Sequence, residues 1–136
     1  MTRDELESYI FTETFLAQLY RKAAAMATRE VEKNTLLQFS QEATQNANYL
    51  NHFYREEYGT NFNPIIPEGN LTGTYRDFLN EILGQEIRSF LKVRSQTYFQ
   101  SNHDLNETMR FISDIKLVHI LSILSIITYL NAPKPH

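Results

Sequence analysis

Two ionisable residues interrupt an apolar stripe in the C-terminal part of the chain. Between residues 105 and 130, apolar side chains recur every three or four residues, and Lys116 and His119 occupy two of these positions, one helical turn apart. This spacing predicts a helix with one buried face. Burying a cation costs several kcal/mol unless a partner offsets its charge. We therefore expect acidic or polar side chains of other helices to lie opposite Lys116 and His119.

Three earlier stretches carry the same kind of stripe, and each contains one polar residue near its middle. These residues are Glu13, Asn46 and Glu86. In an up-and-down bundle of helices of similar length, the helix midpoints lie at one level. The sequence therefore predicts a buried polar cluster in the centre of the core, made of Glu13, Asn46, Glu86, Lys116 and His119. We expect the Lys116 ammonium to pair with the two glutamates, and Asn46 and His119 to complete the hydrogen bonds.

The elements that position this cluster are predicted to be four long helices, because glycine and proline are scarce and clustered. Capping and helix-breaking residues predict starts near Thr2, Thr74 and Asp104 and ends near Ala27, Gly59 and Pro133. The turn between the first two helices is placed within residues 28–35. These boundaries put His103 in a loop and His136 in the C-terminal tail.

The longest predicted connection, residues 59–73, contains two prolines and three glycines. Fully extended it would reach roughly 50 Å, and the flanking helices are each about 40 Å long. The segment can therefore cross the whole length of a bundle. The sequence thus predicts an all-α fold in a single domain, residues 1–136: a four-helix bundle of two helical hairpins joined by a crossover at about 59–73.

The composition argues against several classes of protein. The net charge is −3 and there is no basic stripe, so we expect no nucleic-acid partner. No unbroken apolar run reaches the roughly 18 residues of a membrane span, so we expect no membrane partner. The chain has no cysteine, which fits a reducing compartment, and a cytoplasmic location is expected.

Glu13 is followed seven residues later by Tyr20, and Glu86 lies on the buried stripe of the third predicted helix. In these features and in its helix pattern, the chain resembles the ferritin-like superfamily over essentially its full length, and most closely the rubrerythrin branch. That family holds two metal ions between single glutamates on the first and third helices and Glu-x-x-His motifs on the second and fourth. The resemblance implies a ferritin-like bundle and places Glu13 and Glu86 at the two single glutamates.

The two Glu-x-x-His motifs are degraded in this chain. Asn46-Ala47-Asn48-Tyr49 stands in place of the first and lacks both ligands, and Lys116-Leu117-Val118-His119 keeps only the histidine of the second. Two metal ions need bridging carboxylates, and a lysine beside those that are left would repel a metal. We therefore expect no cofactor and a non-catalytic structural or interaction protein, similar to the spore-coat components among ferritin-like relatives and in that case spore-associated.

Three alternatives stay open. In the first, Glu13, Glu86 and His119 hold a single Fe or Zn ion, or a di-iron centre, in a residual metalloprotein of the oxidase or peroxidase type. In the second, His119 is a core histidine bonded to the hydroxyl of Tyr20 or Tyr49. In the third, a small ligand lies between the helices, lined by Tyr20, Tyr49 and Phe90.

The last predicted helix is apolar on nearly all sides from Leu117 to Leu130. One face of each helix in a four-helix bundle normally meets water, so an apolar outer face indicates a partner surface. We therefore expect a homodimer formed through this helix, with both copies using the same face.

Overall fold

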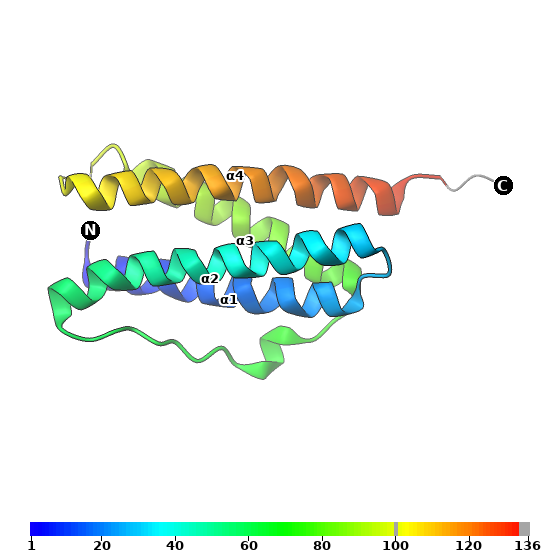
Figure 1. Ribbon diagram of the computed structural model, residues 1–136, viewed down its shortest axis with the longest axis horizontal. Helices are drawn as coiled ribbons and strands as arrows, with labels where there is room; N and C mark the ends of the chain where they lie inside the picture. The colour runs from blue at the N-terminus through cyan, green and yellow to red at the C-terminus, as the bar shows by residue number, and fades with distance from the viewer. Residues whose placement is uncertain (100, 134–136) are drawn as a thin grey trace.

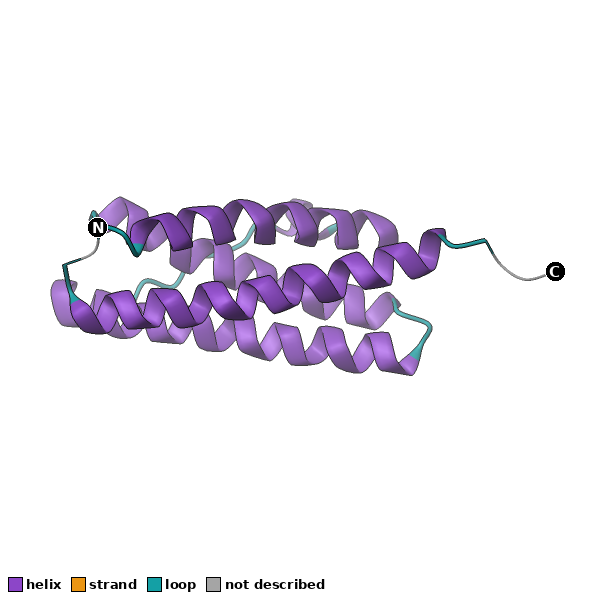
Figure 2. Cartoon of the chain, turned by 90° about the horizontal axis from the view of Figure 1, so that it is seen from above, coloured by secondary structure: helices purple, strands orange, loops and turns teal. Residues whose placement is uncertain are grey.

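The computed structural model describes residues 1–99 and 101–133, which form four α-helices and one short 3₁₀ helix (Figure 1). The elements are α1 (Arg3–Met26), α2 (Glu30–Tyr58), the 3₁₀ helix η1 (Glu68–Leu71), α3 (Tyr75–Gln96) and α4 (His103–Asn131). No strand occurs in the described residues. The helices lie roughly along one axis in both views (Figures 1 and 2), so the predicted all-α four-helix bundle is confirmed.

The connections differ strongly in length, as the pattern of glycine and proline predicts. Residues 27–29 join α1 to α2, whereas residues 59–74 cross from the end of α2 to the start of α3. This crossover, which includes η1, runs along the side of the first hairpin that faces away from α4 (Figure 1). Asn51 fixes it to α2, because its amide nitrogen donates to the Phe62 carbonyl at 3.0 Å and its Oδ1 accepts from the Phe62 N–H at 2.8 Å.

Local side-chain and backbone chemistry sets the helix ends. The Thr2 hydroxyl accepts the N–H of Glu5 at 3.1 Å, and the Thr74 hydroxyl accepts that of Asp77 at 3.1 Å. In each case the carboxylate accepts the backbone N–H of the threonine in return, which completes a capping box. At the C-terminal end of α2, Gly59 has a φ of 79°, a left-handed conformation that glycine adopts without strain.

The start of α4 differs from the prediction. The capping residue is Asn102, whose Oδ1 accepts the N–H of Leu105 at 3.0 Å, and not Asp104. The helix therefore begins at His103, which was expected in a loop. Both asparagine and aspartate are good N-caps, so the sequence alone does not separate two candidates only two residues apart. His136 lies outside the described residues.

Two groups of buried apolar residues fill the core, and the predicted polar residues lie between them on every helix. The larger group comes mainly from residues 15–24 of α1, 36–43 of α2, 78–82 of α3 and 123–126 of α4. The smaller group comes from residues 6–10, 50–54, 93 and 105–112 of the same helices. Between these groups lie buried Glu13, Asn46, Glu86, Lys116 and His119. A polar level therefore separates two apolar halves of the bundle.

Candidate functional site

Lys116 lies at the centre of the polar level. Its side chain is fully buried on α4, and its ammonium forms ion pairs with Glu13 on α1 and Glu86 on α3. The Nζ atom donates to Oε1 of Glu86 at 2.8 Å, and it forms an ion pair with Oε1 of Glu13. Glu13 and Glu86 are only 2% and 1% exposed. The structure thus brings together the lysine and the two acids that the sequence places opposite one another.

His119, one turn further along α4, bridges two carboxylates. Its Nδ1 lies 2.6 Å from Oε2 of Glu86, and its Nε2 lies 2.9 Å from Oε1 of Glu42 on α2. Ionised carboxylates accept hydrogen bonds, so carboxylates at both ring nitrogens favour the doubly protonated imidazolium and raise the pKa of His119. Phe39 stacks on the ring, with the ring centres 4.1 Å apart. All four helices therefore contribute to one ionic network, in which Glu13, Glu42 and Glu86 face Lys116 and His119.

Tyr20 completes the surroundings of Glu86. Its hydroxyl donates to Oε2 of Glu86 at 2.7 Å, and its ring packs edge-on against His119 with the ring centres 5.4 Å apart. The carboxylate of Glu86 therefore accepts from three side chains, those of Lys116, His119 and Tyr20. The alternative in which His119 bonds to the hydroxyl of Tyr20 or Tyr49 is wrong, because carboxylates occupy both ring nitrogens and Tyr49 is 43% exposed.

The two acids that share Lys116 have pKa values shifted in opposite directions. Burial alone would raise the pKa of Glu86, but the Lys116 charge and the contact with His119 outweigh it and lower this pKa to about 2. Burial raises the pKa of Glu13, and the nearby Glu86 carboxylate raises it further, against the attraction of Lys116. When two acids share one ammonium, the first acid to ionise gains its full attraction. The second acid ionises less readily because the first carboxylate repels it. Glu86 is therefore the firmly ionised member.

The cations of the network are held in their charged forms. Burial would lower the pKa of Lys116, but Glu13 and Glu86 outweigh this effect and raise it. Burial would likewise lower the pKa of His119, whereas its contacts with Glu86 and Glu42 raise it. The pKa of Tyr20 is raised well above its usual value by burial and then by the Glu86 charge, so the phenol stays neutral and donates.

Asn46 is buried on α2, yet it does not join the network. Neither Oδ1 nor Nδ2 of Asn46 has a hydrogen-bond partner among the described residues, so the prediction that it completes the hydrogen bonds of the cluster is wrong. Glu42, one turn earlier on α2 and 25% exposed, supplies the contact instead. Sequence reasoning missed Glu42 because it lies beside the buried stripe of α2. Its spacing of four residues from Asn46, which puts both on one side of the helix, was the available signal.

The predicted metal ligands, Glu13, Glu86 and His119, all lie in the network, but their arrangement does not fit a bound metal. The Lys116 ammonium lies between the two carboxylates, and a cation there repels a metal ion. Both ring nitrogens of His119 are already in contact with carboxylates, Nδ1 with Glu86 at 2.6 Å and Nε2 with Glu42 at 2.9 Å. Within residues 1–99 and 101–133, no group of three or more His, Asp and Glu side chains is arranged to hold a metal ion.

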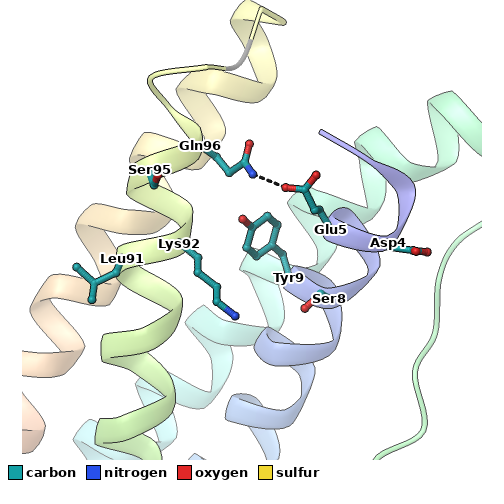
Figure 3. A pocket seen from close by; sticks show the side chains of 8 residues that line it. All are labelled: Asp4, Glu5, Ser8, Tyr9, Leu91, Lys92, Ser95 and Gln96. Carbon is teal, nitrogen blue, oxygen red and sulfur yellow. Dashed lines mark hydrogen bonds between the residues drawn. The ribbon is translucent and has the colours of Figure 1, made fainter.

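Grooves on the surface are lined by other residues. One groove, with a volume of about 640 Å³, lies between α1 and α3 (Figure 3). Its lining residues are Asp4, Glu5, Ser8, Tyr9, Leu91, Lys92, Ser95 and Gln96. The Gln96 amide donates to Glu5 across its upper edge, and Tyr9 and Lys92 extend between the two helices (Figure 3). None of these eight residues belongs to the ionic network, so a molecule in this groove would not touch the buried charges.

Comparisons with known proteins supply no relative from which a role could be transferred. No protein-family model matches the chain, and neither a curated protein nor a solved structure matches it. The ferritin-like resemblance therefore stays a prediction. The case for a function rests on the ionic network and on the surface of the bundle.

Proposed function

We propose that this protein is a metal-free four-helix bundle with a non-catalytic, structural or interaction role. In it, the Lys116 ammonium neutralises the buried acids, as metal ions do in ferritin-like proteins. The observation that carries the proposal is the position of Lys116, which is fully buried in ion pairs with Glu13 and Glu86. A metal ion would have to displace the ammonium from its ion pairs with two buried carboxylates.

The burial of the network supports a non-catalytic role. Glu13, Glu86, Lys116 and His119 are each at most 2% exposed, and Glu42 is partly exposed at 25%. A catalytic acid or base has to come within hydrogen-bond reach of its substrate. Because helices enclose the four most buried members, a solute cannot reach them in this conformation. Their charges are already used in contacts with one another.

Elemental analysis of purified protein tests the proposal. The protein is prepared without chelators, incubated with Fe(II) or Zn(II), and passed through a desalting column before the metal content is measured. We expect far less than one metal ion per chain, no visible absorption band and no peroxide consumption above that of buffer. The variant His52→Ala controls for adventitious binding, because His52 is exposed and lies 3.1 Å from Glu56 at the surface.

A stoichiometric metal ion would overturn the proposal if it persists in His52→Ala and is lost in Glu13→Gln or His119→Gln. That result would establish the alternative of a residual metalloprotein that uses Glu13, Glu86 and His119. A metal signal that disappears in His52→Ala reports surface binding, and it leaves the assignment of Lys116 as the neutralising group in place.

A further inference from the structure

The outer face of α4 exposes a row of apolar side chains. From residue 117 to residue 131 the helix contains no Asp, Glu, Lys or Arg. The large apolar side chains on this face are 42% to 59% exposed; they are Phe111, Leu117, Val118, Leu121, Leu124 and Tyr129. Singly exposed apolar residues are normal on protein surfaces, but a row along one helix face indicates an interaction site.

We propose that the outer face of α4 binds the same face of a second copy of the chain. The two α4 helices run antiparallel, and the two-fold axis crosses the outer face at the level of Ile120 along the helix. This inference rests on the proposed structural role and names the partner for it. A two-fold axis perpendicular to two antiparallel helices brings the same face of each helix against the other, so one row of side chains serves both copies. Leu121, the most exposed of the row at 59%, then meets its own counterpart.

The two ends of the row match each other under this axis. Phe111 and Tyr129 lie at equal distances along the helix on either side of Ile120. Phe111 of one copy therefore meets Tyr129 of the other, and large aromatic side chains are enriched at protein interfaces. Burying the exposed row on both copies would remove on the order of 1,200 Å² from water, which reaches the lower edge of the range for specific interfaces.

The charge on this face is compatible with the same arrangement. Asp114 is exposed, and its carboxylate already pairs with Arg94 of α3 at 3.0 Å. Under the proposed axis, Asp114 of one copy lies over the segment of the other copy that contains the exposed Ser125. Hydroxyl groups can donate to a carboxylate, so this contact places no like charges together.

A lipid bilayer is the other apolar environment that could cover α4, and the ionic network argues against it. By length and composition α4 is able to cross a membrane, because its most apolar 18-residue window has a mean hydropathy of 1.8. Polar residues interrupt that window, so it is not an unbroken apolar run. A helix that left the bundle would separate Lys116 from Glu13 and Glu86 and leave these charges unpaired. A second copy covers the outer face without breaking any of these pairs.

The first experiment measures the mass of the full chain in solution by light scattering and sedimentation equilibrium. We expect the wild type to be a dimer and Leu121→Glu to be a monomer. The dissociation constant of the dimer should be at least about a hundredfold higher in the variant. Ile65→Glu is the matched control, because Ile65 is 90% exposed and belongs to the crossover. The crossover runs along the side of the bundle away from α4 (Figure 1). Unchanged far-ultraviolet circular dichroism shows that both variants fold.

The second experiment tests the antiparallel geometry by cysteine cross-linking, which is clean because the chain has no cysteine. Leu121→Cys should form a disulfide-linked dimer under mild oxidation. Phe111→Cys should cross-link when mixed with Tyr129→Cys, whereas Phe111→Cys alone should not, because its two copies would be roughly 27 Å apart along the helix axis.

A monomeric wild type would overturn the proposal, and so would a dimer that persists in Leu121→Glu or that cross-links through Phe111→Cys alone. Sedimentation of the monomer with vesicles of phosphatidylcholine and phosphatidylglycerol would overturn it in favour of a lipid surface. These outcomes are distinguishable from a failure of the proposed function, because the metal content of the protein is measured separately and does not depend on the dimer.

Discussion

Replacing Lys116 with methionine removes the cation from the core while keeping a side chain of nearly the same length. Glu13 and Glu86, at 2% and 1% exposure, would then be two buried acids without their shared ammonium. Breaking a buried ion pair by removing one partner typically costs about 3–5 kcal/mol. For a domain of this size that loss corresponds to a melting temperature lower by roughly 10–17 °C. We expect a loss of this size for Lys116→Met at pH 7.

The pH dependence of this loss is the sharper test. In the wild type the pKa of Glu86 is lowered from 4.5 to about 2, so its contribution to stability is present above pH 4.5 and is lost as the pH falls toward 2. In Lys116→Met the pKa of both acids is expected to rise, because burial then acts without the Lys116 charge, and only Glu86 keeps its contact with His119. The raised pKa values of Glu13 and His119 already give the wild type some gain in stability as the pH falls. The variant should therefore gain more stability than the wild type as the pH is lowered from 7 to 5.

The assay is guanidinium unfolding of both proteins from pH 4 to pH 8, followed by circular dichroism. The double variant Glu13→Leu/Lys116→Met is the control, since it removes one acid with the cation and leaves Glu86 with His119 and Tyr20 as partners. It should recover most of the lost stability, because replacing a buried pair by apolar side chains is close to neutral. The reasoning fails if Lys116→Met melts like the wild type at pH 7.

Three further predictions concern the surroundings of Lys116. Asn46→Leu should raise the free energy of unfolding by about 1–2 kcal/mol in denaturant titrations, because it removes a buried amide without a hydrogen-bond partner among the described residues; a loss of stability would contradict this. Tyr20→Phe should lower it by about 1 kcal/mol, because Glu86 loses one donor; an unchanged value would show that this bond adds nothing. His119 has a raised pKa in the folded state, so its contribution is fully present below pH 6.5 and is lost as the pH rises through the folded pKa. Unfolding from pH 6 to 9 should show this slope in the wild type and not in His119→Phe, and equal slopes would refute it.

Much of the fold could be predicted from the sequence because helix periodicity and capping are local properties. The capping boxes at Thr2 and Thr74 form as predicted, and the long segment after Gly59 crosses the bundle. The first residue of α4 could not be predicted from the sequence, because asparagine and aspartate are equivalent caps. Only the packed structure selects Asn102 over Asp104.

The residues of the candidate site could be predicted only in part from the sequence, for a related reason. Lys116 and His119 occupy stripe positions, and a polar residue in a buried stripe must find a partner. The stripes do not show how far a side chain reaches. Glu42 extends from beside the stripe of α2 to contact His119, while the shorter Asn46 on the stripe contacts no polar group among the described residues. Such a contact depends on side-chain length and helix spacing, which periodicity does not encode.

The polar level that separates the two apolar halves also bears on how the helices slide along one another. Apolar stripes that repeat every three or four residues tolerate a shift of one turn, about 5.4 Å, with little change in the area they bury. The network built on Lys116 does not, because a shift of that size would move Lys116 a full turn away from Glu13 and Glu86. We infer that it fixes a single alignment of the bundle. A variant with an all-aliphatic centre should therefore melt at a higher temperature and yet give broader amide resonances by NMR.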